Sequence, residues 1–78
     1  MNKMRRKRID EVISKLQDLQ AEIEDITSEE EEYRDNMPEN LVNSEKYEAA
    51  ENACCSLDSA YSSVEEAVDM LEEAANEN

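Results

Sequence analysis

Basic residues gather at the start of the chain, and this is the first place where the sequence could carry chemistry. Five cations lie within the first eight positions, although the whole chain of 78 residues has a formal net charge of -14. Such clusters bind phosphate groups, and arginine does so through two parallel hydrogen bonds. The cluster is therefore a candidate site for a phosphate-bearing small molecule, such as a nucleotide messenger, or for an acidic protein. Its members are Lys3, Arg5, Arg6, Lys7 and Arg8.

A structural role is the alternative for the same cluster. If the chain folds back on itself, the acidic residues Glu72, Glu73 and Glu77 come to lie beside the cations as a charge clamp. Exposed ion pairs of this kind each contribute only about 0 to 1 kcal/mol. The cations also oppose the dipole of a helix that begins here. The sequence leaves the clamp and the binding site open as alternatives.

Acidic residues dominate the rest of the chain. Five of the eight basic side chains lie before residue 9, whereas all 22 acidic ones follow it. One interpretation is a solvated helical face that keeps a small protein in solution. Another is a nucleic-acid mimic, in which carboxylates replace phosphates in the basic groove of another protein. The sign of the charge excludes direct binding of DNA by this face. The densest acidic run is Glu29, Glu30, Glu31 and Glu32.

The groups that usually carry catalysis or bind metal ions are scarce. The chain has no His and no Gly, and its two cysteines, Cys54 and Cys55, are adjacent. The usual nucleophile and base pairs, Cys/His zinc sites and glycine-rich phosphate loops are therefore missing. Adjacent cysteines form only a strained disulfide, which favours reduced thiols and a cytoplasmic location. We expect no enzymatic activity, no metal and no cofactor.

Apolar residues are spaced for two long helices and for no membrane span. No apolar run approaches the roughly 18 residues that a span needs, so we expect no membrane partner. Steps of three and four separate the apolar residues over about 3–34 and again over about 44–75. The loop at about 35–43 holds the single proline, and Asn43 or Ser44 can cap the second helix. We predict one all-α domain over 1–78, an antiparallel, coiled-coil-like helical hairpin.

One constant register pairs the two apolar stripes, because the residue numbers of each pair sum to 80. In the first stripe, Glu30 interrupts the apolar pattern. Ser28 and Glu31 also form a capping-box pattern there, which leaves a bend near Thr27 open. The predicted pairs are Ile9 with Leu71, Val12 with Val68, Leu16 with Val64, Leu19 with Tyr61, Ile23 with Leu57, Ile26 with Cys54, and Tyr33 with Tyr47.

A column of alanines runs beside the stripe of the second helix at seven-residue intervals. Small side chains let another helix approach closely, and two helices alone provide only one seam for a core. We therefore predict a homo-oligomer, either a four-helix-bundle dimer or a larger assembly. The alternative is that alanine serves helix propensity alone. The predicted oligomer interface comprises Ile13, Ala53, Ala60, Ala67 and Ala74.

Four segments carry a resemblance over essentially the whole chain: "RRKRIDEVISKL", "EEEEYRDNMPENL", "SEKYEAAENA" and "SVEEAVDMLEEA". The chain resembles a group of small uncharacterised acidic helical proteins of bacteriophages and mobile elements of Gram-positive bacteria. The resemblance implies such an origin and a place in the cytoplasm of a bacterial host cell. Small non-enzymatic phage oligomers often antagonise host defence, an analogy that carries no residue roles.

The function expected from these observations is therefore that of an interaction protein. It would bind and neutralise a host defence protein or a nucleotide signal. Two alternatives remain, a structural, scaffold or assembly-chaperone role in a phage and the acidic nucleic-acid mimic.

Overall fold

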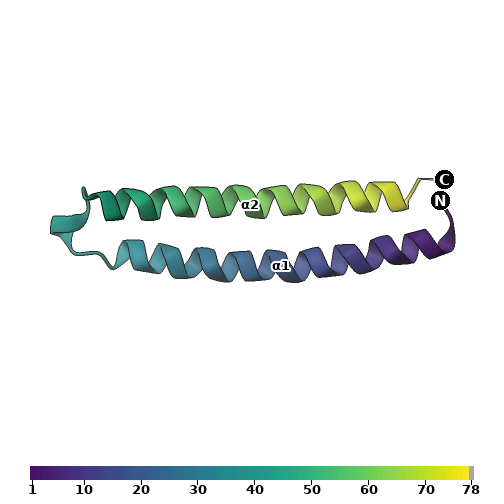
Figure 1. The fold of residues 1–78 in the computed structure, drawn as a ribbon, viewed down its shortest axis with the longest axis horizontal. Helices are drawn as coiled ribbons and strands as arrows, with labels where there is room; N and C mark the ends of the chain where they lie inside the picture. The colour runs from purple at the N-terminus through teal and green to yellow at the C-terminus, as the bar shows by residue number, and fades with distance from the viewer. Residues whose placement is uncertain (78) are drawn as a thin grey trace.

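The computed structural model describes residues 1–77 as two long antiparallel helices (Figure 1). Helix α1 spans Lys3–Asp35 and α2 spans Glu45–Ala75, and the connection between them contains the short 3-10 helix η1, Glu39–Leu41. No strand is present in this part of the chain. The predicted helical hairpin is confirmed, and both helices end within one residue of the predicted bounds.

Each helix begins beside a side chain that accepts a hydrogen bond from its first turn. The Asn2 side-chain oxygen accepts from the Arg5 backbone N–H at 2.8 Å, and Ser44 Oγ accepts from the Tyr47 backbone N–H at 3.3 Å. Such caps satisfy donors that have no partner within the helix. Ser44 is thus the cap among the two predicted candidates, and Asn2 is a cap that the sequence pattern did not indicate.

Helix α1 continues through the segment where the sequence left a bend open. Thr27 is buried, and its Oγ1 donates to the Ile23 carbonyl oxygen at 2.8 Å. This bond to the preceding turn satisfies the buried hydroxyl without interrupting the helix. The capping-box pattern of Ser28 and Glu31 therefore starts no new helix.

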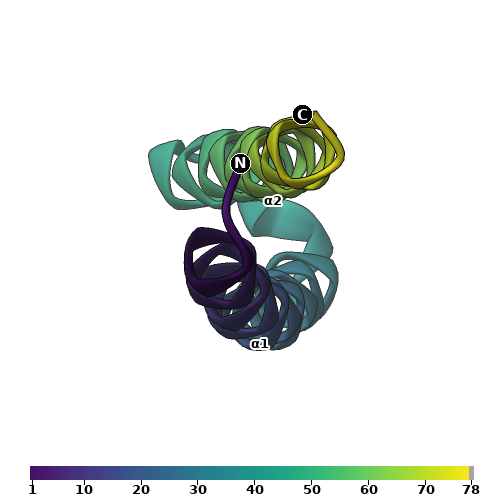
Figure 2. The same ribbon diagram turned by 90° about the vertical axis from the view of Figure 1, so that its right-hand side faces the viewer.

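The backbone of the hairpin forms a thin rod with Cα extents of 60 × 15 × 11 Å, and Figure 2 shows the two helices from the end of this rod. Its radius of gyration is 17.7 Å, whereas a compact domain of this length has about 11.5 Å. The buried apolar residues among those described are Ala50, Cys54 and Val68, all on α2. The exposed area of 6142 Å² is about 1,300 Å² above that of a compact folded chain of this mass. Two helices alone therefore leave much of the surface unburied.

The apolar stripe of α2 faces α1, as predicted. Every member of the predicted stripe is buried or half-buried. The register along the rod is also close to the prediction, because Ile9 and Leu71 line one hollow. Gln20 Nε2 lies 3.5 Å from the Tyr61 carbonyl oxygen, one residue away from the predicted pair of Leu19 and Tyr61.

The predicted face of α1 is wrong at every second position. Ile9, Leu16 and Ile23 are half-buried as expected, but the other four predicted members are exposed. Their neighbours one position later in the chain take their places, namely Ile13, Gln20, Thr27 and Arg34. The four exposed residues are Val12 at 44%, Leu19 at 51%, Ile26 at 50% and Tyr33 at 53%.

The error has a physical reason in the spacing itself. The predicted and observed faces share Ile9, Leu16, Ile23 and Glu30 and the same alternation of steps. The spacing therefore sets the position along the axis but not the rotation about it. Turning these polar side chains toward α2 leaves no buried polar side-chain group within residues 1–77 without a partner. Thr27 donates to the Ile23 carbonyl oxygen, and the Gln20 amide reaches the Tyr61 carbonyl oxygen. No buried side-chain polar atom among the described residues lacks a partner.

Candidate interaction surfaces

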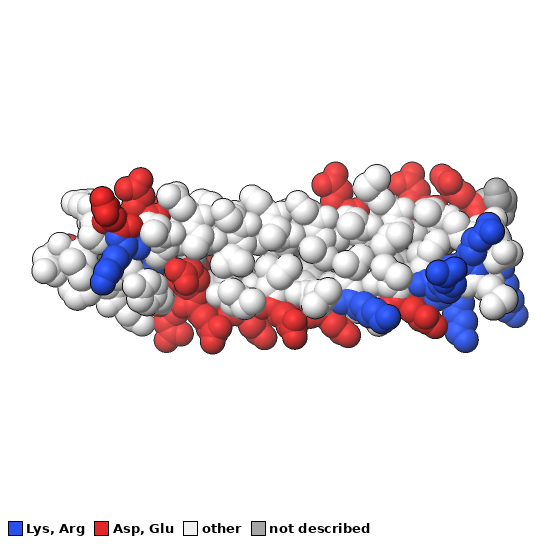
Figure 3. Space-filling view, viewed as in Figure 1, with Lys and Arg blue, Asp and Glu red and all other residues white. Residues whose placement is uncertain are grey.

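The basic cluster lies on the exposed first turns of α1, at the end of the rod where both termini lie (Figure 3). Within residues 1–77, none of its cations forms an ion pair with Glu72, Glu73 or Glu77. The single ion pair in that part of the chain joins Arg34 Nε to Asp35 Oδ1 at 3.0 Å, and this hydrogen bond raises the pKa of Arg34. Within these residues, the structure therefore shows none of the ion pairs that the charge-clamp alternative requires.

The structure divides the basic cluster between two places. Arg5 and Arg8 border an open hollow, whereas Lys3, Arg6 and Lys7 border a separate groove on the outer surface. Lys15, which the sequence analysis did not single out, joins the first pair because it lies one heptad beyond Arg8. The position of a cation on the helix, rather than its place in the run, decides which surface it serves.

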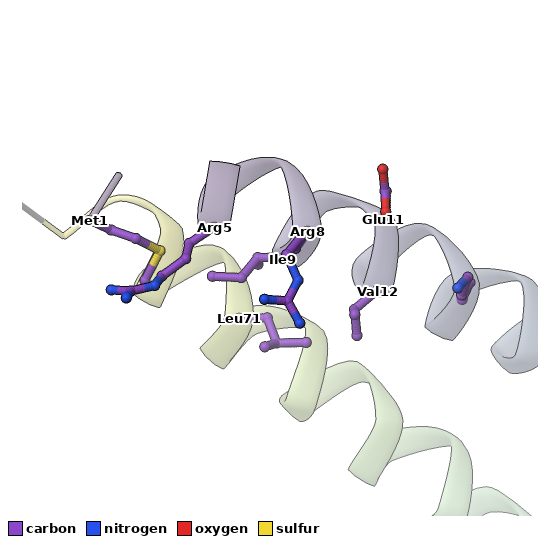
Figure 4. A pocket seen from close by; sticks show the side chains of 8 residues that line it. Met1, Arg5, Arg8, Ile9, Glu11, Val12 and Leu71 are labelled. Atoms are coloured by element: carbon purple, nitrogen blue, oxygen red, sulfur yellow. The ribbon is translucent and has the colours of Figure 1, made fainter. Parts of the chain in front are cut away.

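We call this first hollow the N-end hollow, and its floor is apolar. Figure 4 shows Arg5 and Arg8 extending from α1 toward α2, with Arg8 close to Leu71, while Glu11 points away. An apolar floor bordered by several cations suits a ligand that has both an apolar and an anionic part. The lining residues are Met1, Arg5, Arg8, Ile9, Glu11, Val12, Lys15 and Leu71.

The four-glutamate run is also divided by the helix. Glu29 and Glu32 are exposed, whereas Glu30 and Glu31 are half-buried beside α2. The exposed pair borders a second hollow near the connection, which we call the loop-end hollow. Acidic residues line the outer edge of α1 in Figure 3. The loop-end hollow is lined by Glu29, Glu32, Tyr33, Asn36, Met37, Pro38, Leu41 and Lys46.

The adjacent cysteines point in different directions. Cys54 is buried and Cys55 is exposed, and both are free thiols. Burial raises the pKa of the Cys54 thiol, while the positive charge of Arg34 acts in the opposite direction. A thiol with a raised pKa is a poor nucleophile at neutral pH, so Cys54 serves packing. Residues 1–77 contain no cluster of three or more side chains arranged to hold a metal ion.

Ile13, predicted to line an interface together with the alanine column, is half-buried within the hairpin. An apolar surface nevertheless runs along one side of the rod, and the sequence predicted only its alanine column. Its α1 part is the exposed column spaced by seven residues, and its α2 part is the alanine column. Lys46 lies seven residues before Ala53 and lines one hollow with Tyr33, so both columns lie on the same side. We call this surface the side face. It comprises Val12, Leu19, Ile26 and Tyr33 of α1 and Ala53, Ala60, Ala67 and Ala74 of α2.

The α2 part of the side face is small and uncharged. Ala60 is exposed, and the other three alanines are half-buried within the hairpin. The outer neighbours of this column, again spaced by seven residues, are Ala49, Ser56, Ser63 and Met70. A band without charged side chains also runs along the rod in Figure 3. Small, neutral side chains permit close approach of another helix.

No known family model, curated protein sequence or solved structure matches the chain. Within the described residues, neither helix has a stretch long and apolar enough to cross a lipid bilayer. We therefore infer the function from the surfaces of the hairpin.

Proposed function

We propose that the protein is a non-enzymatic interaction protein that binds a partner protein through the side face. The observation that carries this proposal is the exposed column of Val12, Leu19, Ile26 and Tyr33, each about half accessible on a protein that is otherwise strongly charged. Isolated exposed apolar residues are ordinary, but an apolar column that repeats along one side of a strongly charged protein is typical of a protein interface. A partner helix would bury it through contacts at heptad spacing.

The biological role that fits this proposal is neutralisation of a host defence protein by a phage or mobile-element product. The resemblance of the sequence segments supports that origin. A scaffold or assembly role in a phage uses the same kind of surface, and the identity of the captured partner separates the two roles.

Capture of partners from a bacterial lysate tests the proposal. The native protein is compared with the double variant Leu19→Lys, Ile26→Lys, which places charge in the middle of the side face. The matched control is Ala21→Lys, Ser28→Lys, because both positions are exposed on α1 outside the column. We expect the native protein and the control to retain the same bacterial protein and the side-face variant to lose it. Equal retention by all three would contradict the proposal.

The N-end hollow supports a second candidate function, the binding of a phosphate-bearing small molecule. Arg5, Arg8 and Lys15 border an apolar floor there, and none of them is engaged in an ion pair within residues 1–77. A ligand that binds only the folded state raises the melting temperature. A panel of cyclic and linear nucleotides should therefore contain one that raises the melting temperature of the native protein.

The matched variants for this second test come from the divided basic cluster. Arg5→Gln, Arg8→Gln should abolish the thermal shift, whereas Arg6→Gln, Lys7→Gln, which changes the separate outer groove, should retain it. An equal loss in both variants would indicate nonspecific attraction to the positive end. No shift with any nucleotide would refute this candidate.

A further inference from the structure

We propose that the partner for the side face is a second copy of this chain, packed antiparallel to the first about a two-fold axis. This inference rests on the proposed function, because it names what covers the side face when no bacterial protein is bound there. The result is a four-helix bundle in which α1 lies against α1 and α2 against α2. Three observations support a second copy as the occupant: the unburied area, the order of the charges and the symmetry of the two columns.

The unburied area matches what a dimer requires. A typical stable interface buries about 800 Å² on each partner. Each hairpin exposes about 1,300 Å² more than a compact chain of its mass, so one interface of ordinary size brings it near the usual value. The exposed column from Val12 to Tyr33 is about 31 Å long at the rise of an α-helix, which provides a contact of that scale.

The order of the charges selects the antiparallel arrangement. Beside the exposed column, α1 carries a second column at seven-residue spacing, in the order Arg8, Lys15, Glu22 and Glu29. An antiparallel second copy whose Ile26 faces Leu19 places Lys15 near Glu29 of the second copy, while Arg8 comes near Asn36 and Glu22 near its own equivalent. Opposite charges then meet at the rim of the interface, which favours this orientation. The parallel arrangement places these charges beside the neutral outer neighbours of the alanine column, where nothing compensates them.

The two hollows follow the same order. The N-end hollow has Arg5, Arg8 and Lys15 with one acidic residue, while the loop-end hollow has Glu29 and Glu32 with one cation. Val12 lines the first hollow and Tyr33 the second, so the column runs from one to the other. The antiparallel copy therefore sets a basic hollow against an acidic one at both ends of the rod.

Both columns are compatible with one two-fold axis across the middle of the side face. The axis places Leu19 opposite Ile26 of the second copy and Val12 opposite Tyr33 of the second copy. In the hairpin, residues whose numbers sum to about 80 lie at the same position along the rod. The same axis therefore passes near Ala60. This is the one exposed alanine of the column. Small residues at that point let the two α2 helices approach closely.

Sedimentation equilibrium over a range of concentrations tests the dimer. We expect the native chain to have twice the mass of a single chain and Leu19→Lys, Ile26→Lys to have the mass of one. Circular dichroism should show that this variant keeps its helix content, because both residues are already half-exposed in the hairpin. The control Ala21→Lys, Ser28→Lys adds the same charge elsewhere on α1 and should remain dimeric. A dimeric side-face variant or a monomeric control would overturn the inference.

Charge exchange tests the orientation. Lys15→Glu alone and Glu29→Lys alone should each weaken the dimer about threefold to tenfold, since each change affects two symmetry-related rim contacts. The double variant Lys15→Glu, Glu29→Lys should restore the native dissociation constant. Failure of the double variant to recover would reject the antiparallel arrangement. Glu22 lies near its own equivalent at the axis, so Glu22→Gln should tighten the dimer.

The failure of this inference is distinguishable from failure of the proposed function. A native chain that stays monomeric at about 100 μM, well above ordinary dimer dissociation constants, overturns the dimer. If Leu19→Lys, Ile26→Lys nevertheless loses a captured bacterial protein, the proposed function stands with a different occupant. If the same variant disrupts the dimer but no bacterial protein is retained by the native chain, the dimer stands and the proposed function fails.

Discussion

The two helices are nearly equal in length but differ in how they use their apolar residues. In α2, the whole apolar stripe faces α1, and the acidic side chains lie on the remaining surface. In α1, Ile9, Leu16 and Ile23 face α2 while a second apolar column, from Val12 to Tyr33, stays exposed. A helix with an apolar surface this wide fits more than one neighbour. The hairpin therefore covers the apolar stripe of α2 but leaves part of the apolar surface of α1 exposed.

The interface between the helices shows the same asymmetry in its chemistry. Helix α2 contributes the buried apolar residues Ala50, Cys54 and Val68, whereas the buried residue of α1 is Thr27. Gln20 is also turned toward α2. Polar side chains in this position contribute less hydrophobic stabilisation than apolar ones. Most of the stability of the isolated hairpin should therefore come from the α2 side.

The strongest test of this comparison places the same charge on each helix. Val68→Asp buries a carboxylate and should lower the free energy of unfolding by about 3 kcal/mol or more. Leu19→Asp changes a half-exposed position and should lower it by only about 1 kcal/mol at concentrations where the chain is monomeric. Urea denaturation followed by circular dichroism measures both. Equal losses would show that α1 and α2 contribute equally.

The helix caps offer a second comparison. Ser44→Ala removes the cap of α2 near the connection, and it should cost about 1 kcal/mol. Asn2→Ala removes the cap of α1, whose first turns are exposed and pack little against α2. Its cost in global stability should be clearly smaller. Thermal unfolding of both variants beside the native chain measures the difference, and a larger effect at Asn2 would contradict it.

The fold could be predicted from the sequence, but most of this difference between α1 and α2 could not. The steps of three and four predicted both helices, and the single proline located the connection. The same steps fit a face with Leu19 and a face with Gln20, so the rotation of α1 depended on where Gln20 and Thr27 find partners. The candidate site shows the same limit, because the run of cations predicted a basic end but not the inclusion of Lys15.

A third experiment increases the apolar burial contributed by α1, so that α1 resembles α2 in this respect. In Gln20→Leu, an apolar side chain replaces the amide that lies 3.5 Å from the Tyr61 carbonyl oxygen. Such a long hydrogen bond contributes little, and additional apolar burial should raise the free energy of unfolding by about 0.5 to 1 kcal/mol. Gln20→Ala, which removes the amide without adding apolar volume, is the control and should not stabilise the hairpin. A loss of stability in Gln20→Leu would show that the amide is required.

The smallest expected effect concerns the two neighbouring thiols and is a pH dependence. Burial raises the pKa of Cys54 above its ordinary value, with Arg34 opposing the shift and Glu31 adding to it. Above the pKa of about 8.5 in the unfolded chain, the unfolded state loses this proton before the folded state does. The contribution of the protonated Cys54 thiol to the stability of the folded state is therefore complete below that pH. It is lost as the pH rises through the pKa of this thiol in the folded state.

The measurement is the free energy of unfolding between about pH 8 and about pH 10, where thiols titrate. The native chain should lose more stability over this interval than Cys54→Ala, which lacks the buried thiol. Cys55→Ala is the matched control, because it removes an exposed thiol from the next position and should keep the native slope. The three chains differ only at these two thiols, so the difference in slope isolates Cys54. Parallel curves for both variants would show that burial on the α2 side does not set the protonation of this thiol.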